Sequence, residues 1–103
     1  MKNKITKEKL EKYFSITREA YFKAKESIKK KKYTMEDKMH FKKEVADDFL
    51  DMIDRYIRDA EYFYKKKDYV NSFACLNYSH GWLDAGARAE IFDVNDSRLF
   101  TVD

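Results

Sequence analysis

Apolar side chains recur every three or four positions along most of the chain, which is the spacing of one face of an amphipathic helix. The first such stretch predicts a helix over about residues 7–30, and Thr6 is well placed to cap its start. Lysine and glutamate side chains occupy the opposite side of this helix. Its predicted inner face consists of Leu10, Tyr13, Phe14, Thr17, Tyr21, Ala24 and Ile28.

Two further stretches with the same spacing predict helices over about residues 35–66 and 69–91. A capping sequence that begins at Thr34 precedes the second helix, and Asp68 is placed to cap the third. Residues 92–103 contain too many apolar side chains for a solvated tail. We therefore expect this short C-terminal tail to pack back onto the helices.

The placement of turn residues favours an all-α fold. The chain has no proline and both of its glycines lie in the last quarter, whereas an all-β protein would need turn residues about every ten positions. We expect residues 1–103 to form one domain, an up-and-down three-helix bundle with short connections. A single cysteine, no apolar run long enough to span a membrane and no signal peptide predict a cytoplasmic protein without a membrane partner.

Charge is distributed unevenly along the chain. Residues 1–32 hold 12 Lys and Arg against 4 Asp and Glu, whereas residues 68–103 hold 2 against 6. The first predicted helix ends in a run of four lysines: Lys29, Lys30, Lys31 and Lys32. This run is a candidate nucleic-acid patch, although no known recognition motif accompanies it. The alternative is a solvated helix end, where cations complement the helix dipole.

The third predicted helix carries a line of polar residues at the edge of its apolar face. His80, Asp84 and Arg88 follow one another at intervals of four residues and therefore share one side of the helix. One interpretation is a hydrogen-bonded network that fixes how the helices pack. The other is a small-molecule or enzymatic pocket, because a histidine with a carboxylate one turn away could transfer a proton. No recognised nucleophile accompanies them, which favours a non-enzymatic role.

Glycine and tryptophan are unusual in the interior of a helix of this kind. Gly81 belongs to a ridge of mostly small side chains, and a helical glycine often marks close approach by another part of the protein. We therefore expect close contacts at Gly81, Gly86 and Trp82. Trp82 points roughly away from the apolar face, where it would lie under the tail or bind a partner. The ridge consists of Asn77, Gly81, Ala85 and Ala89, and the residues beside Trp82 are Cys75 and Ser79.

Two histidine–carboxylate pairs raise the question of a metal site. His40 with Glu44, and His80 with Asp84, both have the spacing of neighbours on one helix face. In antiparallel helices that meet near residue 67, however, the two pairs would lie roughly 20 Å apart. We therefore expect no metal and no cofactor.

Part of the third helix resembles a known family. The matching motif is Asn77-Tyr78 and His80-Gly81-Trp82-Leu83-Asp84-Ala85-Gly86. It is similar to an archaeal family known only as domain of unknown function 357. The resemblance implies a left-handed three-helix bundle like the albumin-binding domain, and it implies no activity.

These observations lead to one main hypothesis and two alternatives. The main hypothesis is a non-enzymatic protein-interaction or scaffold module that binds another protein or a second copy of itself. Its candidate interface residues are Asn77, His80, Gly81, Trp82, Asp84 and Arg88. The alternatives are nucleic-acid binding through the basic first helix, and a pocket for a small molecule or substrate beside His80 and Asp84.

Overall fold

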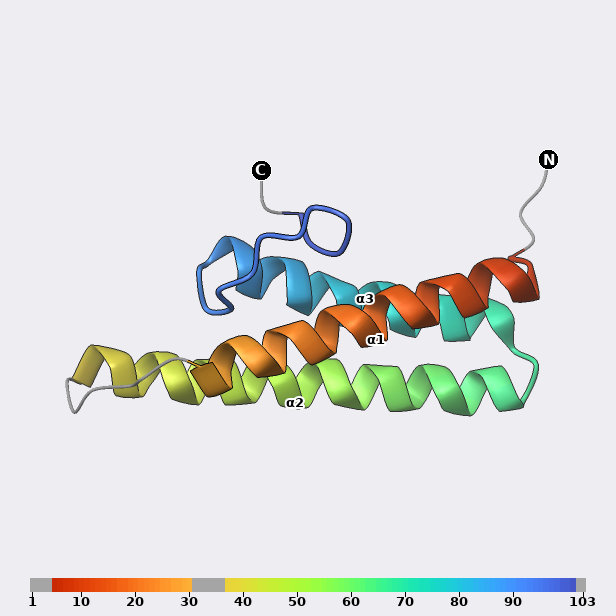
Figure 1. The fold of residues 1–103 in the computed structure, drawn as a ribbon. Helices are drawn as coiled ribbons and strands as arrows, with labels where there is room; N and C mark the ends of the chain where they lie inside the picture. The colour runs from red at the N-terminus through yellow and green to blue at the C-terminus, as the bar shows by residue number, and fades with distance from the viewer. Residues whose placement is uncertain (1–4, 31–36, 102–103) are drawn as a thin grey trace.

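Figure 1 shows the fold in a computed structural model of the chain, which describes residues 5–30 and 37–101 and, for 37–42, only the backbone. Three helices follow one another: α1 (Lys7–Lys30), α2 (Asp37–Lys65) and α3 (Tyr69–Arg88). Described residues 89–101 follow α3 and include the C-terminal tail, which lies along α1 and α3 (Figure 1). The all-α fold and its three helices confirm the prediction. None of the described helices is both long and apolar enough to cross a membrane.

The start of α1 has the predicted cap. The hydroxyl oxygen of Thr6 accepts a hydrogen bond from the backbone N–H of Lys9 at 3.1 Å. This bond satisfies one of the backbone donors that lack a partner in the first helical turn. The predicted cap of α2 at Thr34 lies outside the described residues.

A tight turn joins α2 to α3, and a lysine rather than a glycine ends α2 there. Lys67 has φ of 60°, the left-handed conformation that commonly ends a helix. The backbone N–H of Asp68 then donates to the carbonyl of Phe63 at 2.9 Å. The Asp68 carboxylate accepts from the N–H of Asn71 at 3.2 Å. One residue thus closes α2 and caps α3, as predicted for the start of α3.

The C-terminal end of α3 lies three residues earlier than predicted. Glu90 has φ of 60°, and the N–H of Ile91 donates to the carbonyl of Gly86 at 2.8 Å. This is the same arrangement that ends α2, and it turns the chain away from the helix axis. Apolar spacing continues through residue 91, so the pattern alone extended the helix too far.

Helices α2 and α3 run antiparallel along a seam that contains two buried serines. Ser72 donates to the carbonyl of Ala60 at 2.8 Å, and Ser79 donates to the carbonyl of Ile53 at 2.9 Å. Both serine side chains are fully buried. The expectation that Ser79 lies opposite the packed face is therefore wrong. A serine side chain can lie in the core when its hydroxyl has a hydrogen-bond partner.

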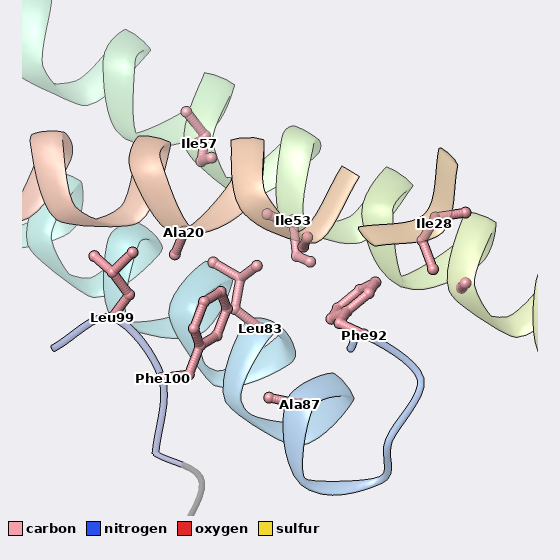
Figure 2. Packing of buried hydrophobic residues seen from close by; sticks show 11 residues of the cluster. Ala20, Ile28, Ile53, Ile57, Leu83, Ala87, Phe92, Leu99 and Phe100 are labelled. Carbon is pink, nitrogen blue, oxygen red and sulfur yellow. The ribbon is translucent and has the colours of Figure 1, made fainter. Parts of the chain in front are cut away.

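The main core gathers side chains from all three helices and the tail (Figure 2). Phe92, Leu99 and Phe100 of the tail are each at most 2% exposed. This burial confirms that the tail packs back onto the helices. The labelled residues of Figure 2 are Ala20, Ile28, Ile53, Ile57, Leu83, Ala87, Phe92, Leu99 and Phe100.

Gly86 is the glycine that the packing requires. A Cβ atom at this position would collide with the ring of Phe92, which lies directly against the helix backbone. At Gly81, which is exposed, nothing lies within 4 Å of the corresponding point apart from its chain neighbours and the backbone of its own helix. Within the chain, the close contact expected at these two glycines occurs at Gly86 and not at Gly81.

Candidate functional site

His80 joins three parts of the molecule. Its Nδ1 lies 3.1 Å from the hydroxyl of Thr17 on α1, and its Nε2 lies 2.6 Å from the carbonyl oxygen of Leu99 in the tail. A carbonyl oxygen only accepts, so Nε2 carries a proton. In the neutral ring, Nδ1 then accepts the hydroxyl proton of Thr17. The imidazole thus connects α3 to α1 and to the tail.

Asp84 holds the tail one helical turn farther along α3. Its Oδ1 accepts from the backbone N–H of Thr101 at 2.9 Å, and Oδ2 accepts from the hydroxyl of Thr101 at 3.4 Å. Oδ1 also lies 3.7 Å from Nε2 of His80. The predicted proximity of His80 and Asp84 is confirmed, and both residues act on the tail. Arg88 is exposed at the last position of α3.

Ion pairs fasten the tail to α1 from the other side. Arg98 makes two hydrogen bonds to the Glu19 carboxylate, at 3.2 and 2.6 Å. Lys23 donates to Asp96 at 3.1 Å. The hydrogen bond from Arg98 lowers the pKa of Glu19, and that from Lys23 lowers the pKa of Asp96. The sequence analysis missed these contacts, because no local pattern connects charges that are 73 and 79 residues apart.

A cleft opens beside His80, where the groove between α1 and α3 continues past the tail. Its volume is about 320 Å³, which is at the lower end of the range for small-molecule sites. Its polar lining includes the His80 ring and the carboxylate of Asp84, which already hold the tail. The lining residues are Tyr13, Ile16, Thr17, Leu76, Asn77, His80, Asp84 and Arg98.

Trp82 lies on the side of α3 that faces α2. Its ring meets Phe49 edge to face, with 4.9 Å between the ring centroids, and Phe49 also meets Phe92 at 6.4 Å. Trp82 is half-buried at the rim of the main core. Packing against α2 therefore accounts for much of the burial of the Trp82 side chain.

The outward surface of α3 carries no charged side chain over most of its length. Between Asp68 and Asp84 there is no Asp, Glu, Lys or Arg, although 40% of the chain is charged. Two large apolar side chains on this surface are strongly exposed, Val70 at 63% and Tyr78 at 57%. We call the exposed residues of this surface the neutral face: Val70, Ala74, Asn77, Tyr78, Gly81 and Ala85.

The basic residues of α1 largely contact other groups of the chain. Arg18 pairs with Glu61 at 3.3 Å, and its guanidinium lies 4.7 Å from the centre of the Phe14 ring. Lys29 pairs with Glu26 at 3.6 Å, and Lys30 is exposed at the helix end. The other two residues of the predicted basic run, Lys31 and Lys32, lie outside the described residues.

No three His, Cys, Asp or Glu side chains come together to form a possible metal site among the described residues. The side chain of His40 lies outside this description, so its distance from His80 stays a prediction. His80 and Asp84 are engaged by Thr17, Leu99 and Thr101, as their hydrogen bonds show.

The geometry defines a class of small helical protein in which a C-terminal tail is fastened across two of three helices. Comparison with protein families assigns the chain more closely. It belongs to the family described as protein of unknown function DUF357, whose pattern matches residues 12–92. No curated protein and no solved structure matches the chain.

Proposed function

We propose that this chain is a protein-interaction module that binds a helix of another polypeptide along the neutral face of α3. The absence of charge from this exposed face is the observation that supports the proposal. Centres of protein interfaces are depleted in charged side chains and enriched in aromatic ones. The other residues proposed for the interface, His80, Trp82 and Asp84, support the face from behind by fixing α3 against the tail and α2.

Gly81 strengthens this proposal because the fold itself does not need a glycine there. A glycine inside a helix costs about 1 kcal/mol relative to alanine. No atom within 4 Å would meet a side chain at this position. A partner helix lying across Gly81 could approach the backbone closely and bury Val70 and Tyr78 on either side.

Site-specific photo-crosslinking in the native host tests the proposal. A photoreactive phenylalanine analogue replaces Tyr78 on the neutral face, and in a matched control it replaces Phe22 of α1, which is similarly exposed at 59%. We expect a discrete protein adduct from position 78 and none of the same mass from position 22. Adducts to nucleic acid alone, or the same protein adducts from both positions, would contradict an interaction site on α3.

The cleft beside His80 supports a second candidate function, the binding of a small molecule. Its size and mixed polar and apolar lining favour this candidate. A fragment screen observed by NMR would test it through the ring signals of His80 and Tyr13. Fragments that shift these signals saturably would support a ligand site, and a screen that moves neither would remove it.

We also propose the finer features that the family resemblance implies. These are a left-handed arrangement of the helices, as in the albumin-binding domain, and an origin in an archaeal cytoplasm. The three helices are compatible with the first of these features. The absence of a membrane-spanning helix among the described residues is compatible with the second. An experimental structure and localisation of the tagged protein in its host would test both.

A further inference from the structure

We infer that the partner of the neutral face is a second copy of the chain, packed with the two α3 helices antiparallel. This inference rests on the proposed function and adds the identity of the partner. It follows from the spacing of the face, from its charges and from its size.

The positions of the neutral face are spaced symmetrically along the helix, at intervals of four, three, one, three and four residues. In an antiparallel pair related by a two-fold axis, each contact between two positions occurs twice, once in each direction. If the axis passes between Asn77 and Tyr78, Val70 lies opposite Ala85 of the other copy. Ala74 then lies opposite Gly81 of the other copy. Each large side chain thus meets a smaller one, which a parallel pair would not achieve because Val70 would face Val70 and Tyr78 would face Tyr78.

The charges of α3 favour the same arrangement. A charged side chain from a foreign partner would lose water against the neutral face without meeting an opposite charge. The partner surface must therefore be uncharged over a similar length, and α3 itself supplies such a surface. The same register places the mixed charges that flank the face, Lys67 with Asp68 and Arg88 with Glu90, at the two ends of the contact.

Helix α2 borders the neutral face, because its Tyr56 meets Tyr78 with 4.5 Å between the ring centroids. Charged side chains of α2 therefore lie at the rim of the contact, and the rims of protein interfaces are commonly polar and solvent-accessible.

The size of the face predicts a weak and reversible dimer. A helix of 20 residues is about 30 Å long and about 10 Å wide with its side chains. Its footprint is therefore about 300 Å² on each copy, or about 600 Å² in total, which is below the roughly 1,200–2,000 Å² of stable specific interfaces. We expect association in the micromolar to millimolar range rather than a permanent dimer.

Sedimentation equilibrium of the full chain from micromolar to millimolar concentration tests the inference. We expect a monomer–dimer equilibrium that Gly81→Leu weakens at least about tenfold, because the larger side chain separates the helices. Phe22→Ala, which removes an exposed ring from α1, should leave the equilibrium unchanged. A monomer at all concentrations, or a dimer indifferent to Gly81→Leu, would overturn the inference. Photo-crosslinks from position 78 to a different protein would still support the proposed function.

Crosslinking between two single-cysteine proteins tests the orientation. In a Cys75→Ala background, one protein carries Ala74→Cys and the other Gly81→Cys, and a short bismaleimide is added to each alone and to their mixture. An antiparallel pair gives the mixed adduct in preference to either self-adduct. Preference for the self-adducts would overturn the antiparallel arrangement, and equal yields would indicate random collision and overturn the specific dimer.

Discussion

The two glycines of α3 allow a direct test of the packing, because alanine should have opposite effects at the two positions. At Gly81 no atom lies within 4 Å of the added methyl group, so the only change is the gain in helix propensity. This gain is about 1 kcal/mol. At Gly86 the methyl group would collide with the buried ring of Phe92. Overpacking of a core costs about 1–3 kcal/mol, so the net loss after the same propensity gain is about 0–2 kcal/mol.

Urea unfolding at low protein concentration, followed by circular dichroism, measures both free energies while the neutral face is unoccupied. For a domain of this size, 1 kcal/mol corresponds to a change of about 4–8 °C in Tm, so thermal unfolding should show the same opposite signs. Ala85→Gly is a matched control, because it removes a methyl group from an exposed position one turn beyond Gly81 and should cost about 1 kcal/mol. A destabilising Gly81→Ala, or a stabilising Gly86→Ala, would refute the assignment of these two sides of α3.

Three further predictions follow from the helix ends and the tail contacts. Glu90→Gly should raise the free energy of unfolding by about 1 kcal/mol, since residue 90 has φ of 60°; a loss measured by urea unfolding would contradict this geometry. The pKa values of Glu19 and Asp96 are lowered, so their ion pairs stabilise the attached tail at pH values above the ordinary carboxyl pKa. This stabilisation is lost as the pH falls through the lowered pKa values. Amide exchange in the tail, corrected for its intrinsic pH dependence, should therefore accelerate in acid, and protection that persists after both carboxylates protonate would exclude these ion pairs as anchors. The hydrogen bond to Glu11 raises the pKa of Tyr64 to about 12, so Glu11→Gln should move its ultraviolet titration to lower pH, and an unchanged curve would exclude the bond.

The sequence predicted the helices well because their signals are local. The spacing of apolar residues and the caps at Thr6 and Asp68 depend on neighbours within a few positions, and both caps are present in the structure. The early end of α3 gave no such signal, because it is formed by Glu90 in a conformation usually taken by glycine.

The orientation of α3 could not be predicted as well, because periodicity identifies a buried face without saying which residues lie at its centre. Phe73 and Ile91 have the helical spacing of the buried Leu76, Leu83 and Ala87 but are only half-buried, whereas Ser72 and Ser79 lie fully buried against α2. The sequence left open whether the ridge that includes Gly81 packs against another helix, and in the structure it faces outward. The contacts of the tail were beyond prediction for another reason, since residues such as Glu19 and Arg98 meet only through the complete fold.

Binding in the cleft would break contacts that hold the tail, whereas binding on the neutral face would break none of them. This difference favours the neutral face over the cleft. A ligand that used the Nε2 of His80 would have to displace the carbonyl of Leu99, and one that took both oxygens of Asp84 would have to displace Thr101. Such a ligand would compete with the tail and loosen Leu99, which is buried in the main core. A partner helix on the neutral face would break none of these contacts. It would also bury Val70 and Tyr78, the large apolar side chains of α3 that the fold leaves exposed to water.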